Sequence, residues 1–196
     1  MSALASLLCA CYSTPSPRYY ALGAGPPAPG LKIAGAGSAA TAPAVTAGGS
    51  TVVVDVVAIP AAVDRPQFVL SGEGNEVSID DDHRWAGPLQ SSVAEVLARD
   101  LMGSEKPGAS SARYRVEVEI LAFESRLDED VRLEATWKIR RDDGASSSGL
   151  SRVREPAPGR DFSALAAAHS RAISRLANEI ALAIRDLDTQ HPSQHS

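Results

Sequence analysis

The residues of this chain best suited to chemistry form a short acidic run that ends in a histidine, Asp80-Asp81-Asp82-His83. Carboxylates and imidazole are common ligands of divalent metal ions, so the run is a candidate metal site. Its spacing matches neither a closed tetrahedral ligand set nor the calcium-binding loop pattern. We therefore favour the alternative, a solvated acidic turn, and expect no metal and no cofactor.

The serines and the other histidines show no catalytic pattern. The sequence contains no Gly-x-Ser-x-Gly motif, no Walker loop and no dinucleotide-binding fingerprint. His169 lies on the apolar face of a predicted helix, which is typical of a buried structural histidine, while His191 and His195 lie in the C-terminal tail. The chain is therefore predicted not to be an enzyme.

The two cysteines follow a short apolar stretch at the N-terminus, where Leu8-Cys9-Ala10-Cys11 is similar to the lipobox of bacterial lipoproteins. In that signal the cysteine, here Cys11, is acylated and becomes the first mature residue. More than one acyl chain makes such membrane anchoring stable. This interpretation predicts a signal peptide over residues 1–10 and a covalent lipid on Cys11. The alternative is a frayed cytosolic N-terminus with two incidental cysteines.

Composition separates a neutral front from an acidic body. The chain has 196 residues, of which 44% are hydrophobic and 5% aromatic, and its formal net charge is −5. An acidic surface with few aromatic rings argues against nucleic-acid binding. Residues 11–49 are rich in Gly, Ala and Pro and are predicted to form a disordered, lipidated tether. Within it, Tyr19-Tyr20-Ala21-Leu22 is apolar enough to dock as an edge strand.

Residues 50–188 predict a single α+β domain, with an antiparallel or mixed sheet covered by two helices, followed by a disordered tail over 189–196. The near-continuous β-branched run at 51–59 is typical of a strand buried on both faces. Further strands are predicted at 67–71 and 76–80 and in an antiparallel meander over 114–120, 131–139 and 145–154. Helices are predicted over 88–101 and from a cap at Asp161 to 187.

The apolar positions of the last predicted helix recur at a spacing of three and four residues. They are Phe162, Leu165, His169, Ile173, Leu176, Ile180, Ile184 and Leu187. Such a seam either covers the meander, which is the interpretation we favour, or pairs with another helix as a coiled coil.

Several sequence blocks stand in a characteristic order along nearly the whole chain. They are Tyr19-Tyr20-Ala21-Leu22, Ile59-Pro60 ahead of Asp64-Arg65-Pro66-Gln67, Asn75-Glu76-Val77, Arg84-Trp85-Ala86-Gly87-Pro88-Leu89 and the C-terminal Ala-rich helix. This order resembles the PqiC-like auxiliary lipoproteins of ABC-type transport systems, which work beside MCE-domain proteins. The chain departs from the family pattern at Gly87, where an acidic residue is more usual, and in lacking a basic start to its signal.

The resemblance implies a lipoprotein of the Gram-negative envelope that is anchored to the outer membrane and faces the periplasm. It implies no catalytic centre, no nucleic-acid partner and no small-molecule substrate, but a role in lipid transport between membranes through binding of the MCE component and its transporter. Tyr12 follows Cys11 where an aspartate would indicate retention at the inner membrane. The alternative is a direct lipid-binding carrier, which would need an apolar cavity between sheet and helix, or an envelope-assembly lipoprotein.

Arg65, Gln67, Asn75, Arg84 and Trp85 are the candidate partner-binding residues. Arginine and tryptophan are enriched at interface hot spots, and Arg84 and Trp85 directly precede a helix start. In the alternative, Trp85 packs beneath that helix and Arg84 pairs with the acidic run. For the Asp-Arg-Pro-Gln block, we favour a rigid lead-in to the second strand.

Overall fold

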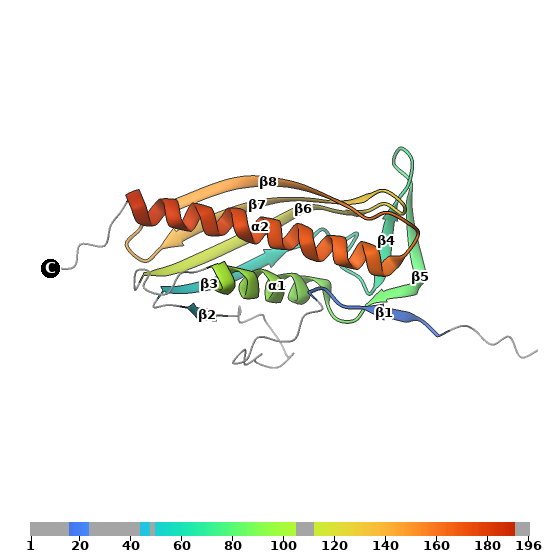
Figure 1. Ribbon diagram of the computed structural model, residues 1–196, viewed down its shortest axis with the longest axis horizontal. Helices are drawn as coiled ribbons and strands as arrows, with labels where there is room; N and C mark the ends of the chain where they lie inside the picture. The colour runs from blue at the N-terminus through green and yellow to red at the C-terminus, as the bar shows by residue number, and fades with distance from the viewer. Residues whose placement is uncertain (1–15, 24–43, 48–49, 105–111, 191–196) are drawn as a thin grey trace, which may run out of the picture.

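Two helices pack on one face of a mixed eight-stranded sheet (Figure 1). The computed structural model describes residues 16–23, 44–47, 50–104 and 112–190. The elements are β1 (Arg18–Tyr20), β2 (Ala44–Ala47), β3 (Ser50–Ala58), β4 (Gln67–Ser71), β5 (Val77–Trp85), α1 (Leu89–Ser104), β6 (Arg113–Ser125), β7 (Asp130–Arg141), β8 (Ser146–Pro156) and α2 (Phe162–Gln190). The expected α+β fold is confirmed.

Strand β6 connects the two halves of the sheet. One of its edges pairs in parallel with β3 and, at Ser125, with Leu70 of β4. Its other edge pairs with β7, which pairs with β8, and this β6–β7–β8 unit is the predicted antiparallel meander. Beyond β4 the sheet continues through β5 to β1, so β1 and β8 lie at opposite edges.

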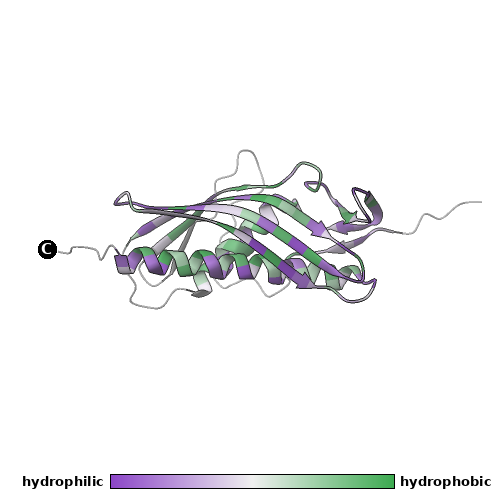
Figure 2. Cartoon of the chain, turned by 90° about the horizontal axis from the view of Figure 1, so that it is seen from above, coloured by the Kyte–Doolittle hydropathy of each residue, from purple (hydrophilic) through white to green (hydrophobic). Residues whose placement is uncertain are grey.

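Helix α2 forms the second layer of the core. Asp161 caps it, because the backbone N–H of Ser163 donates to Asp161 Oδ1 at 2.9 Å. A hydrogen bond from the Ser163 hydroxyl and, to a smaller extent, this backbone bond lower the pKa of the Asp161 carboxyl. All eight predicted seam positions of α2 are buried. The seam packs on β7 and β8 of the meander, as predicted, and also on α1. Within the described residues, no helix covers the far face of the sheet (Figure 2).

The prediction that the β3 segment is buried on both faces is wrong. Val52, Val54 and Val57 are buried, whereas Val53 and Asp55 are partly exposed on the opposite face. There Asp55 forms an ion pair of 2.9 Å with Arg115 of β6. The reason is that both helices lie on the same side of the sheet, so a run of valines has only one apolar layer to pack against.

Two segments of the predicted tether belong to the sheet. Strand β1 pairs with the end of β5, which confirms the expected edge strand. Residues Ala44–Ala47 were expected to be disordered but pair with β3 as β2, through backbone bonds that need no large side chains. At the other end, α2 continues to Gln190, two residues into the predicted tail. Cys9, Cys11 and residues 191–196 lie outside the described residues.

Candidate functional site

The pairing of strand β5 with β4 is interrupted part-way along. Gln67 and Phe68 are neighbours on β4, yet they pair with Arg84 and Asp80 of β5. The three residues between Asp80 and Arg84, 81–83, therefore have no pairing partner on β4 and form a large bulge. The acidic run predicted to be a solvated turn is thus a bulge inside a strand. His83 to Trp85 then pair in parallel with β1.

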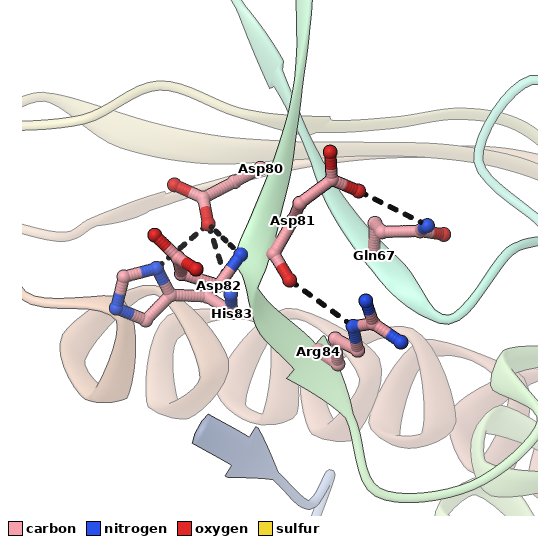
Figure 3. A network of polar contacts seen from close by, with 6 residues as sticks. All are labelled: Gln67, Asp80, Asp81, Asp82, His83 and Arg84. Atoms are coloured by element: carbon pink, nitrogen blue, oxygen red, sulfur yellow. Dashed lines mark hydrogen bonds and ion pairs between the residues drawn. The ribbon is translucent and has the colours of Figure 1, made fainter. Parts of the chain in front are cut away.

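The Asp80 carboxylate holds this bulge together (Figure 3). Its Oδ1 accepts the backbone N–H groups of Asp82 at 3.0 Å and His83 at 2.9 Å, and it lies 2.8 Å from His83 Nδ1. The His83 ring stacks on Phe162 at the start of α2, with ring centres 3.7 Å apart. The carboxylate thus has a structural role, and the described part of the chain contains no group of three potential metal ligands.

The bulge also brings together two of the sequence blocks that contain candidate residues. Gln67 Nε2 donates to Asp81 Oδ1 at 3.3 Å, and Arg84 Nε donates to the Asp81 backbone oxygen at 3.1 Å (Figure 3). The backbone N–H of Trp85 donates to Pro66 O at 2.7 Å. Arg84 is therefore held by a carbonyl of the acidic run, whereas the sequence-based alternative expected an ion pair.

Four of the five candidate residues lie near one another, and Asn75 does not join them. Asn75 is exposed in the turn between β4 and β5. Arg65 is half-buried in the segment that leads into β4, where Pro60 O accepts the N–H groups of Val63 and Asp64 in a tight turn. The block therefore leads into β4, which is the position that the sequence analysis favoured for it.

Trp85 belongs to the core. Its side chain is 6% exposed, and its ring stacks on Phe68 with centres 4.0 Å apart. Edge contacts to Phe123 and His169 complete an aromatic cluster between the sheet and α2. Trp85 is therefore a core residue, as in the alternative in which it packs beneath the following helix. Its aromatic neighbours, however, come from β4, β6 and α2.

Exposed apolar side chains that the sequence analysis missed lie on the face of the sheet opposite the helices. Tyr19, Val77 and Ile79 are 63%, 60% and 48% exposed. Strand pairing places Tyr19 beside Arg84, Arg84 beside Gln67, and Ile79 beside Val69. We call this surface the outer patch, and it comprises Tyr19, Gln67, Val69, Val77, Ile79 and Arg84. The valine and isoleucine at alternate positions 77 and 79 were the available signal.

His169 is buried in the aromatic cluster behind Trp85. Its ring stacks on Phe123 with centres 3.9 Å apart, and Nε2 lies 2.7 Å from Ser125 Oγ. Burial lowers the pKa of His169 to about 3, so the ring is neutral at physiological pH. Among the described residues Nδ1 has no hydrogen-bond partner, hence no carboxylate completes a catalytic triad.

The residues described in this subsection, except those of β1, belong to the part of the chain that matches a protein-family model. A family model described as ABC-type transport auxiliary lipoprotein component matches residues 32–181. The chain belongs to this family. The expected resemblance is therefore confirmed, and the outer patch is a feature of an auxiliary lipoprotein of an ABC-type transport system.

Solved structures share the fold of the auxiliary lipoprotein. The crystal structure of an uncharacterized protein has a TM-score of 0.66 at 16% identity and covers 87% of this chain and 99% of its own. Protein XCC0632 from Xanthomonas campestris has a TM-score of 0.57 at 20% identity, covering 68% and 83%. No curated protein matches the sequence. None of the helices in the described segments is long and apolar enough to cross a membrane.

Removing the Trp85 ring is expected to destabilise the auxiliary lipoprotein far more than removing the neighbouring guanidinium. Trp85→Ala leaves a cavity among Phe68, Phe123 and His169 and should lower the free energy of unfolding by about 3–5 kcal/mol. Arg84→Ala, on the other face, should cost less than about 1 kcal/mol. Urea unfolding followed by circular dichroism measures both, and equal losses would contradict the assignment of Trp85 to the core.

The buried His169 predicts a specific loss of stability in acid. In the unfolded chain the imidazole binds a proton below about pH 6.5, whereas in the fold it does so only near pH 3. Protonation therefore favours unfolding, and stability falls from pH 6.5 towards pH 3 by about 1.4 kcal/mol per pH unit at most.

The matched comparison is His169→Gln, which retains a hydrogen-bonding group for Ser125 and does not titrate. Urea unfolding at pH 7.5 and pH 4.5 should show a smaller acid loss in the variant, by about 2.5–3 kcal/mol. The same acid loss in both proteins would show that His169 is not the group responsible.

Proposed function

We propose that the auxiliary lipoprotein is anchored to the outer membrane by a lipid on Cys11 and faces the periplasm. There it binds the MCE-domain component of an ABC-type system that moves lipid between membranes, and it catalyses no reaction itself. The family match is the observation that carries this proposal. The lipobox-like sequence before Cys11 and the outer patch beside β1 add to it.

The position of β1 gives the proposal a geometry. From Cys11 to Arg18 the chain advances seven residues, which reach at most about 25 Å when fully extended. A lipid on Cys11 therefore keeps β1 within about 25 Å of the membrane surface. The β4–β5 hairpin lies at the same end of the molecule as β1, and α2 ends at the other (Figure 1).

The outer patch has the composition of a protein-binding surface. It combines an exposed tyrosine, two exposed β-branched side chains and an arginine whose guanidinium is oriented by the Asp81 carbonyl. Aromatic residues and arginine are enriched at protein interfaces. Single exposed apolar side chains are common on monomers, but a group of them on one surface often marks an interaction site. In this proposal Arg84 and Gln67 contact the MCE partner, while Trp85 supports them from the core.

The packing of the core speaks against the alternative of a direct lipid carrier. An acyl chain would need space between α2 and the sheet, but Leu165, Ile173, Leu176 and Ile180 fill it and are 0% exposed. Native mass spectrometry that detects a bound lipid would favour the carrier instead.

The anchor is tested by fractionation of cells that express the full chain with a C-terminal tag. Cys11→Ala should move the protein from the membrane fraction to the soluble fraction, because the acylated sulfur is lost. Cys9→Ala is the matched control and should stay in the membrane fraction. Retention of Cys11→Ala in the membrane would refute the proposed anchor.

The partner and the surface are tested by a detergent pull-down from the same membranes. The wild-type chain should recover an MCE protein and its permease, and Ile79→Ser should recover at least threefold less because it removes apolar area from the outer patch. Leu121→Ser, at a similarly exposed leucine of β6 outside the patch, should recover the wild-type amount. Equal recovery by both variants would exclude the outer patch, and recovery of no MCE protein by any would refute the partner.

A further inference from the structure

Strand β8 offers a long, regular edge. Among the described residues it pairs only with β7, through an unbroken register from Arg140↔Ser146 to Asp130↔Pro156. The β3–β6, β4–β5 and β6–β7 pairings all contain register shifts, whereas this one contains none. Such an edge presents a row of backbone N–H and C=O groups that another extended chain can complete.

Arginines lie along the C-terminal half of this edge on both faces of the sheet. Arg154 lies on the outer face and contacts Asp130, which Arg126 also contacts at 2.7 Å. Arg171 and Arg175 extend from α2 and share Glu155, with Arg171 Nε 3.0 Å from the carboxylate.

The carboxylates of this cluster are covered, and the guanidiniums are not. The side chains of Asp130 and Glu155 are 4% and 3% exposed, whereas those of Arg154, Arg171 and Arg175 are between 51% and 64% exposed. An approaching molecule therefore meets positive charge along the C-terminal half of this edge, although the whole chain has a net charge of −5.

The other half of the edge has no arginine on β8 and carries two exposed leucines beside a run of serines. Leu150 of β8 is 46% exposed and Leu182 of α2 is 56% exposed. Glu179 contacts Ser151 of β8, so helical spacing places Leu182 over the next part of the strand. The Trp137 ring lies against Gly149, where an added Cβ would be 2.3 Å from the ring. The glycine therefore lets a large aromatic ring lie beside the strand edge.

We propose that the β8 edge binds an extended, acidic segment of a partner protein as an added strand. Backbone hydrogen bonds to β8 supply the pairing, and carboxylates of the segment contact Arg154, Arg171 and Arg175. Apolar side chains at its other end contact Leu150 and Leu182. A second copy of this chain is a poorer occupant, because the only acidic residue of β8, Glu155, is buried and so offers no carboxylate to the arginines of another copy.

This inference goes beyond the function proposed above. It concerns a different edge of the sheet and needs neither the lipid on Cys11 nor an MCE component. Its test can therefore fail while the proposed function stands, and the reverse also holds.

The test uses a fluorescein-labelled twelve-residue peptide of alternating glutamate and threonine, and a second peptide with lysine in place of glutamate. Fluorescence anisotropy with the full chain should show binding of the glutamate peptide only. Hydrogen–deuterium exchange should show added protection of amides within 146–156, because the new strand takes up the outward-facing N–H groups.

The key variant combines Arg154→Gln with Arg175→Gln. It leaves Asp130 with Arg126 and Glu155 with Arg171, so neither buried carboxylate loses its last arginine. The glutamate peptide should bind this variant about tenfold more weakly. A control that combines Arg113→Gln with Arg115→Gln removes the same charge from β6 and should bind like the wild type.

Four results would overturn the proposal. They are no binding of the glutamate peptide at millimolar concentration, equal binding of the two peptides, protection outside β8, and unchanged binding by the Arg154/Arg175 variant. Protection of β8 without peptide that increases with protein concentration, together with a dimeric mass, would assign the edge to a second copy instead.

Discussion

Burial of one apolar seam of α2 against the β6–β7–β8 meander is the interaction on which the remaining structure depends. Ile173, Leu176 and Ile180 are completely buried in it, and a buried side chain of this size contributes about 1.5–3 kcal/mol. The 29 residues of α2 extend about 43 Å, which matches the 13 residues of β6. Both helices of the described residues pack on this face of the sheet. The far face and the strands at the edges are therefore the surfaces of the sheet that can contact other molecules.

The parts of the fold that follow from side-chain periodicity were predictable from the sequence. The alternation in β6 and β7 and the seam of α2 each point to one buried layer, and His169 takes its place in that layer as expected. The parts that depend on backbone pairing were not predictable. Ala44–Ala47 joins β3 without a distinctive side-chain pattern. The valines of β3 give the same sequence signal whether one face or two are covered, and the placement of α1 and α2 decides the outcome.

The bulge in β5 explains why the candidate site was only partly predictable. In a regular strand, Trp85 would lie on the same face as Val77 and Ile79, because alternate residues share a face. Three residues without a partner on β4 reverse this alternation, so Trp85 enters the core while Val77 and Ile79 stay exposed. Asp80 stabilises the bulge by accepting two backbone N–H groups. The acidic run, which by its residue types was a candidate metal site, therefore determines that Trp85 and the pair Val77 and Ile79 lie on opposite faces of the sheet.

The two edges of the sheet differ in their chemistry, and this difference restricts how partners can bind. Around β5 the carboxylates of Asp81 and Asp82 are exposed beside the outer patch. At the C-terminal half of β8 the carboxylates of Asp130 and Glu155 are buried, and the arginines that contact them are exposed. An acidic segment is attracted to the β8 edge and repelled near the bulge, so of these two surfaces it favours the β8 edge. The outer patch instead presents apolar side chains next to Arg84, and its binding depends on shape and apolar area. One partner that contacted both surfaces would therefore need two distinct segments, and its orientation on the sheet would be fixed by the separation of charge.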